Sequence, residues 1–235
     1  MGIQKVLALT LRREIAQMDK LVRNSNLKFP RISPYKASMR LNTPQKQEMF
    51  SQYVQRIGDV VDKQRQEVCS FDVLDIIKSD IKGLKKNHYG DCGESSSLTM
   101  GALLANGYKD GKIMQLMFDA EVRDMTTHEL LDKRVLDTTH QFVVRHYNEA
   151  ADFSNPKTYG KNLIVMDAWG GFCANMQEAF KKYYELFMNG MRKYQQPEHN
   201  IEIIYKPRFA ATNAERLITP EDIENIRKLF PELIV

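Results

Sequence analysis

The stretch "NHYGDCGESSSLTMGALLANGY" at residues 87–108 decides which fold we expect. Cys92 stands in a glycine-rich elbow, and the apolar run that follows it ends at Asn106 and Gly107, a pair typical of a helix C-terminus. The pattern therefore predicts a helix over residues 93–106 with Cys92 at its beginning. A cysteine in this position is either a small buried apolar side chain or a nucleophile activated by the helix N-terminus.

The composition limits the class of protein. With 43% hydrophobic and 27% charged residues, this chain of 235 residues matches a soluble globular protein. No apolar run reaches the roughly 18 residues of a transmembrane segment. The opening "MGIQKVLALTLRREIAQ" lacks the features of a secretory signal peptide, because charges flank its short apolar part. Three cysteines without a C-x-x-C pair indicate a reducing compartment, so we expect a cytoplasmic location and no structural zinc site.

The net charge of +4 conceals an asymmetry along the chain. Residues 1–90 contain 17 Lys and Arg against 9 Asp and Glu, whereas the remainder contains 17 against 21. A basic half can face an acidic partner or a membrane surface. Because these charges are dispersed, we interpret them as a solvated helical surface, and we expect no nucleic-acid partner.

Residues 1–86 are predicted to form a helical N-terminal region that packs on the core. Apolar residues recur at helical spacing over residues 4–23, and prolines then interrupt the pattern. A second helix is expected from Pro44, and a third after Ser70, which is a suitable N-cap. The apolar stripes of these two helices are Met49, Tyr53, Ile57 and Val60, and then Val73, Ile77, Ile81 and Leu84.

Residues 87–235 are predicted to form the core. Short runs rich in β-branched and alternating apolar residues indicate strands, and amphipathic runs with capping signals indicate helices. The expected strands are 112–122, 140–147, 161–169 and 200–207, and the expected later helices are 175–190 and one that begins after Thr219. The chain thus begins with several helices and continues with strands that are interspersed with further helices. This order of elements predicts an α+β fold.

Two of the predicted strands place a histidine beside an aspartate. Residues 140, 142 and 144 share one face of their strand, and residues 163, 165 and 167 share one face of theirs. If the two strands form an antiparallel hairpin with 144 opposite 163, His140 lies opposite Asp167. A shift by one residue would turn one set to the other face. His146, six residues further along, is too distant to join the same site.

This pairing predicts a nucleophile, a base and an orienting acid. Asp167 can accept the imidazole N–H of His140 and stabilise the imidazolium. A helix N-terminus and a neighbouring imidazolium both favour the thiolate form of a cysteine, here Cys92. The backbone N–H of Cys92 is a natural oxyanion donor, and the Asn87 side chain is a weaker candidate. The glycines on either side, Gly90 and Gly93, would let a substrate approach closely.

Three segments together resemble the transglutaminase-like and papain-like cysteine enzymes. They are "GDCGE" opening a helix, "THQFVV" starting a strand and "IVMDAW" closing one, and the resemblance covers roughly residues 85–172. It implies a nucleophile-bearing helix packed on a small antiparallel sheet. Within that core it implies Cys92 as nucleophile, His140 as base and Asp167 as orienting acid. Trp169 matches the aromatic residue that often follows the aspartate, and we expect it to shield the site from water.

In character, the sequence resembles bacterial effector enzymes of this superfamily, many of which modify glutamine side chains of host proteins. The resemblance thus implies a glutamine deamidase or transglutaminase that forms a cysteine thioester on a protein substrate, without cofactor or metal. It also implies a secreted effector that acts in a host cytosol. The chain lacks the "CGSCW" of the papains and has Lys86 where they have glutamine, which argues against protease activity. We therefore rank proteolysis through the same triad second, as the alternative to deamidation or transamidation.

Other interpretations of the same residues remain open. Cys92 can be a buried thiol beside a structural His–Asp pair, in an inactive module that only binds a partner. The three side chains can instead ligate a metal, although they lack local pairing. Cys173 is a second candidate nucleophile because "WGGFCANM" is also rich in glycine, and Cys69 is expected to be buried. His88 is expected in a surface loop, and Glu94 to interact with the helix dipole.

Overall fold

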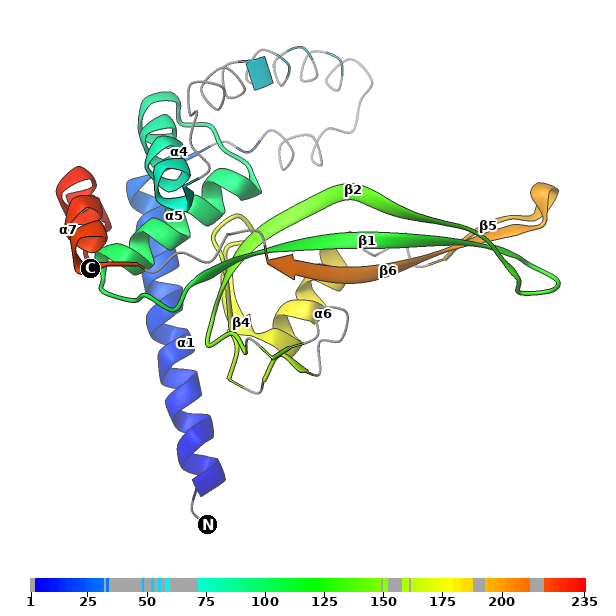
Figure 1. Cartoon of the computed structure of the whole chain (residues 1–235), viewed down its shortest axis with the longest axis horizontal. Helices are drawn as coiled ribbons and strands as arrows, with labels where there is room; N and C mark the ends of the chain where they lie inside the picture. Colours follow the sequence, from blue (N-terminus) through cyan, green and yellow to red (C-terminus); the bar gives the residue numbers. More distant parts are fainter. Residues whose placement is uncertain are drawn as a thin grey trace.

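The fold is a mixture of helices and one antiparallel sheet, an α+β arrangement as expected (Figure 1). The computed structural model describes residues 3–31, 33, 48, 52, 55, 58–59, 72–148, 150–151, 158–160, 162–187, 193–211 and 218–235. The α-helices are α1 (Ile3–Lys28), α4 (Val73–Asn87), α5 (Cys92–Ala105), α6 (Met176–Phe187) and α7 (Pro220–Leu229). The strands are β1 (Lys112–Asp124), β2 (Leu130–Arg145), β3 (Ile164–Asp167), β4 (Phe172–Asn175), β5 (Lys193–Gln196) and β6 (Ile201–Ala211). Short 3-10 turns follow at Pro197–His199 and Pro231–Leu233.

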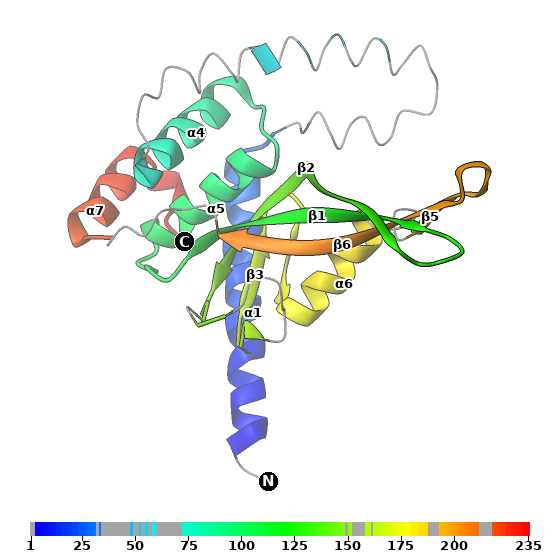
Figure 2. The same cartoon turned by 45° about the vertical axis from the view of Figure 1, so that its right-hand side comes forward.

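The strands form a six-stranded sheet in the order β4-β3-β2-β1-β6-β5, and every neighbouring pair is antiparallel. Helices α1, α4, α5 and α7 gather at one end of the sheet, while β1, β2 and β6 extend beyond them as a long ribbon (Figures 1 and 2). The hairpin of β5 and β6 lies at the far end of this ribbon. The histidine and the aspartate of interest lie on β2 and β3, at the helical end.

Helix α5 is the centre of the helical end, and it begins at Cys92 as the sequence indicates. Its first turn carries a capping box, in which Asp91 is the N-cap and the Asp91 N–H donates to the Glu94 side chain at 2.9 Å. All of its residues from Glu94 to Ala105 are buried. A helix that is apolar around its whole circumference must be covered on all sides, and here α1, α4, α7 and the sheet cover it.

The N-terminal helices share their hydrophobic interior with α5. Met18 and Val22 of α1 and Ile77 of α4 belong to the same buried cluster as Leu98 of α5. Helix α1 matches the expectation for residues 4–23 and continues to Lys28. Helices α1 and α4 therefore pack on α5, while the division of the chain at residue 86 stays a prediction.

The start of α4 differs from the predicted one. The N-cap of α4 is Asp72, whose side chain accepts the Leu74 N–H at 2.8 Å, and not Ser70 as expected. A cap must lie next to the first helical residue to reach its free N–H groups, and Ser70 lies two residues too early and outside the described residues. The apolar stripe of the helix expected from Pro44 also lies outside them.

The predicted strands are confirmed, with differences at their ends. β2 begins at Leu130, ten residues before the expected start, because pairing with β1 extends it through a charged stretch without clear alternation. β4 and β5 were not expected, since each is only four residues long. The C-terminal helix begins as expected, with Thr219 and Asp222 forming a capping box. No helix in the described ranges is long and apolar enough to cross a membrane.

The contact between α4 and α5 gives a test of the packing. A Cβ at Gly101 would lie 2.4 Å from the Cδ1 methyl of Ile81, so Gly101→Ala should lower the free energy of unfolding by about 1–3 kcal/mol through overpacking. Ile81→Val removes this methyl. In that background Gly101→Ala should be neutral or stabilising, since alanine favours helix by about 1 kcal/mol. Urea unfolding of the four proteins in this double-mutant cycle measures the coupling, and simple additivity would contradict the contact.

Candidate active site

A buried contact joins β2 to the end of β3. His140 Nε2 lies 2.7 Å from Asp167 Oδ2, and both side chains are almost completely excluded from solvent. Buried charged groups are found paired because an isolated charge is costly to desolvate. The structure thus brings together the histidine and the aspartate that the sequence predicts to be neighbours.

The register that produces this contact differs from the predicted one by two residues. Val144 pairs with Val165 and not with residue 163, so His140 and Asp167 are diagonal neighbours and not directly opposite. Because side chains alternate with a period of two, a shift by two keeps both on the same face, where a shift by one would have separated them. The face is therefore as predicted, and the direct pairing is wrong.

A bulge lies immediately before His140. On β1 the register advances by two residues, from Leu116 to Phe118, while on β2 it advances by four, from His140 to Leu136. The two additional residues on β2 disrupt the ladder beside the histidine. Bulges bend a strand and change the direction of nearby side chains. This bulge lies directly beside His140.

The turn after β3 holds the Asp167 carboxylate. The Gly170 N–H donates to Asp167 Oδ1 at 2.6 Å, while His140 contacts the other oxygen. A Cβ at Gly170 would lie 2.6 Å from Asp167 Oδ2, so the position needs glycine for close approach. Gly171, at φ +75°, donates its N–H to the Asp167 carbonyl at 2.7 Å and closes the turn.

Cys92 lies on the other side of the imidazole. The thiol is half-buried at the first position of α5, and it forms a hydrogen-bonded contact with His140. Because Nε2 contacts Asp167, Nδ1 is the ring nitrogen left for the thiol. This order is the reverse of the Ser-His-Asp triad, in which the carboxylate contacts Nδ1, but it keeps the base between the nucleophile and the acid.

The surroundings of His140 favour its charged form. Burial opposes protonation, but the charge of Asp167 and its hydrogen bond, together with the contact to Cys92, outweigh burial and raise the pKa of His140 to about 9. At neutral pH the site therefore contains an imidazolium between a carboxylate and a thiol. An imidazolium is the species that favours a neighbouring thiolate.

Aromatic rings surround the imidazole. The ring centroid of His140 lies 4.9 Å from that of Trp169, 5.3 Å from that of Tyr183 and 6.2 Å from that of Phe142. Trp169 thus lies where a shield against water would be needed. Complete burial, and then the charge of Asp167, hold the pKa of Tyr183 well above its ordinary value, so its hydroxyl stays protonated at neutral pH. Helical periodicity assigns Tyr183 to the core or to an interface, and it does not predict the contact with His140.

The remaining predicted site residues surround the start of α5. Asn87 is the last residue of α4 and is half-buried, as is Gly93 in the first turn of α5. A Cβ at Gly90 would lie 2.5 Å from Leu84 Cδ2 and 2.8 Å from Glu94 Cβ, which gives this glycine a packing role. Substrate binding at these positions stays a prediction.

The structure gives local roles or environments to other residues that the sequence singles out beside the proposed triad. Cys173, on β4, has its thiol pKa raised by burial and by the neighbouring Asp19 and Asp167 carboxylates, so it stays protonated at neutral pH. Glu94 serves the capping box of α5, as expected for a helix-start residue. His88 is the left-handed C-cap of α4 and is exposed. Cys69 lies outside the described residues, and within them no cluster of three or more His, Cys, Asp or Glu side chains is arranged to hold a metal ion.

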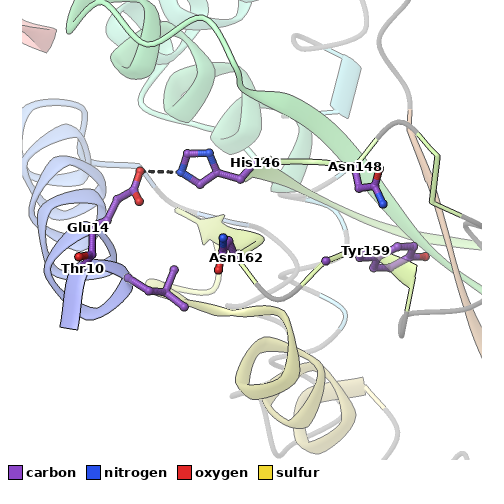
Figure 3. A pocket seen from close by; sticks show the side chains of 8 residues that line it. Thr10, Glu14, His146, Asn148, Tyr159 and Asn162 are labelled. Atoms are coloured by element: carbon purple, nitrogen blue, oxygen red, sulfur yellow. Dashed lines mark hydrogen bonds and ion pairs between the residues drawn. The ribbon is translucent and has the colours of Figure 1, made fainter. Parts of the chain in front are cut away.

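A separate pocket of about 410 Å³ lies at the end of β2, between α1 and the segment around Tyr159 (Figure 3). His146 Nε2 contacts Glu14 at 2.7 Å along its wall, and Asn148 and Asn162 also line it. His146 lies six positions after His140, just beyond the end of β2, and six positions of extended chain span roughly 20 Å. The pocket is therefore not part of the Cys92 site.

Two residues that contact the site come from the segment after α1, and sequence patterns did not single them out. Arg31 Nε donates to Ser95 Oγ at 2.9 Å, and Ser33 Oγ accepts from Trp169 Nε1 at 2.9 Å. Both follow Pro30 in a stretch without periodicity, and the sequence contains no local signal for their position.

Comparisons of the chain with protein-family models, with curated proteins and with solved structures found no match.

The His140–Asp167 contact predicts a titration shift. Asp167→Asn removes the carboxylate charge, so the pKa of His140 should fall from about 9 by at least about 1 unit. Imidazole resonances followed by NMR against pH measure this value in wild type and variant. An unchanged His140 titration would contradict the charged contact.

The same shift predicts how stability depends on pH. Because the folded pKa of about 9 exceeds the unfolded value of about 6.5, protonation of His140 stabilises the fold fully below about pH 6.5. The contribution is lost as the pH rises through 9, and its upper limit is about 3 kcal/mol. Urea unfolding of wild type and His140→Gln at pH 6 and pH 9.5 should show a smaller difference at the higher pH.

Proposed function

We propose that this protein is a cysteine-dependent acyl-transfer enzyme that acts on glutamine carboxamides of protein substrates, as a deamidase or transglutaminase. One observation carries the proposal: the His140 imidazole is buried between the Asp167 carboxylate and the Cys92 thiol. A nucleophile, a base and a group that orients the base are the parts that covalent acyl transfer needs. The resemblance of the three segments to thiol enzymes selects the carboxamide substrate.

The reaction divides into two steps. In the first, the Cys92 thiolate attacks the carboxamide carbon, and the tetrahedral intermediate collapses to a thioester as the His140 imidazolium gives its proton to the departing ammonia. In the second, neutral His140 takes a proton from water or from an amine, which attacks the thioester and releases Cys92. Water yields glutamate and an amine yields an amide crosslink. Asp167 keeps the imidazole oriented throughout.

The fold supports this chemistry in two ways. Cys92 is the first residue of α5, so the positive end of the helix dipole favours its thiolate and the developing oxyanion. The aromatic rings of Trp169 and Tyr183 pack around His140 and help to exclude water from the ion pair. A helix that begins at the nucleophile and packs on antiparallel strands carrying the histidine and the aspartate is also what a papain-like or transglutaminase-like core would contain.

Thiol labelling tests the nucleophile. Near neutral pH iodoacetamide should modify Cys92 faster than Cys69 or Cys173, because burial and nearby carboxylates hold the Cys173 thiol protonated. His140→Ala should remove the advantage of Cys92. Peptide mass mapping of the time course measures each rate, and Cys173→Ala is the control that should leave the Cys92 rate unchanged. Equal labelling of all three thiols would favour the inactive partner-binding module.

Product masses test the reaction. With casein as a glutamine-containing test protein, deamidation adds about 1 Da per site and amine crosslinking loses about 17 Da, while proteolysis yields fragments. Cys92→Ala should abolish whichever change occurs. The activity should also fall at high pH with an apparent pKa near 9, since the His140 imidazolium is the acid that protonates ammonia. Fragments without a deamidated product would replace the proposal with the protease alternative.

A further inference from the structure

The segment after α1 contacts both halves of the site. On one side, Ser33 Oγ donates to Asp91 Oδ1 at 2.6 Å, and Asp91 is the N-cap directly before Cys92. On the other side, Ser33 Oγ accepts from Trp169 Nε1 at 2.9 Å, two residues after Asp167. A single buried hydroxyl therefore connects the start of the nucleophile helix to the end of the strand that carries the acid.

Asn26 and Arg31 repeat this connection. Asn26 Nδ2 donates to the Ala168 carbonyl at 3.0 Å, directly after Asp167, and its Oδ1 accepts from Arg31 Nη1 at 2.9 Å. Arg31 Nε donates to Ser95 Oγ, which itself donates to the Asp91 carbonyl at 2.6 Å. We name Asn26, Arg31 and Ser33 the clamp. Through its contacts the first turn of α5 and the residues after β3 are hydrogen-bonded to one common segment.

Arg31 also adds a positive charge. Its guanidinium is mostly buried, and burial lowers its pKa to about 10 although Asp167 and Glu94 both favour the charge, so it remains protonated at neutral pH. Among the described residues, the charged and titratable groups around the site include Asp91, Cys92 and Glu94 on and before α5, His140 on β2, Asp167 on β3, Cys173 on β4 and Tyr183 on α6. Asp19 and Arg23 of α1 also act on Cys173, on the β4 side. Arg31 is the cation of this set that the clamp contributes.

We propose that the clamp positions the Cys92 thiol against the His140–Asp167 pair, and that the Arg31 charge sets the pH range in which the thiolate–imidazolium pair exists. This inference rests on the proposed function, because a positioning residue needs a reaction to position. Asn26, Arg31 and Ser33 act through Asp91, Ser95, Ala168 and Trp169, and none of the three is assigned a contact with substrate.

The Ser33 arm of the test uses the rate of Cys92 alkylation by iodoacetamide. Ser33→Ala removes both hydrogen bonds and should slow alkylation by about tenfold, since small displacements of reacting groups have large effects on rate. Ser33→Thr keeps the hydroxyl and should restore most of the rate. Ser25→Ala is the matched control, because Ser25 is buried and its hydroxyl donates to the Leu21 carbonyl within α1. Equal rates in Ser33→Ala and Ser25→Ala would overturn the positioning role.

The Arg31 arm uses the pH profile of the same reaction. Removing a cation disfavours the thiolate and favours the imidazolium, so Arg31→Gln should move both limbs of the profile to higher pH. Arg31→Lys keeps the charge and should leave the limbs in place even if the rate falls. Arg227→Gln is the control, because Arg227 donates to the Ala105 carbonyl at the other end of α5. A purely structural role would change the rate without moving the limbs.

The outcomes separate the two proposals. If His140→Ala abolishes the selective labelling of Cys92 but the clamp variants match their controls, the clamp is overturned and the proposed function stands. If wild-type Cys92 shows no labelling that depends on His140, both are overturned. Thermal unfolding of each variant identifies loss of folding, and in that case Ser33→Thr and Arg31→Lys, which keep the hydroxyl and the charge, decide the question.

Discussion

The arrangement of the site depends on the burial of two opposite charges next to each other. His140 and Asp167 are withdrawn from water together, and the cost of desolvating each is offset only while the other remains within contact. Removing one partner of such a pair costs about 3–5 kcal/mol. The constraint extends to Gly170, which must lack a side chain so that its N–H can reach the second carboxylate oxygen. Tyr183 and Trp169 then fill the space that water would otherwise occupy.

Helix α5 connects this pair to the rest of the molecule. Because it is buried on all sides, its axis is determined by α1, α4, α7 and the sheet together, and the position of Cys92 follows from that axis. The capping box then determines where the helix begins, and therefore which residue receives the effect of the helix dipole. Packing therefore determines the axis of α5, and the capping box determines its first residue. Together they place the Cys92 thiol beside the His140 imidazole.

The two described thiols lie in different electrostatic environments. Both follow glycine-rich stretches, and both are partly accessible. Cys173 lies in a strand near two carboxylates, which oppose ionisation in addition to its burial. Cys92 lies at a helix N-terminus and contacts an imidazolium. In the proposed role of the clamp, the Arg31 guanidinium adds a positive charge near the Asp167 and Glu94 carboxylates.

The sequence by itself determined most of the helices and the longer strands among the described residues, and the faces of the two strands that carry His140 and Asp167. The stretch from Cys92 to Gly107 specifies a helix with its start and end, and strand alternation places His140 and Asp167 on one face, because periodicity and capping are local properties. Only the tertiary structure decided the register, the bulge before His140, the early start of β2 at Leu130 and the contacts of Arg31 and Ser33. These depend on groups far apart in the chain. A change of register by two residues leaves every face unchanged, so the periodicity of a single sequence cannot distinguish one such register from the next.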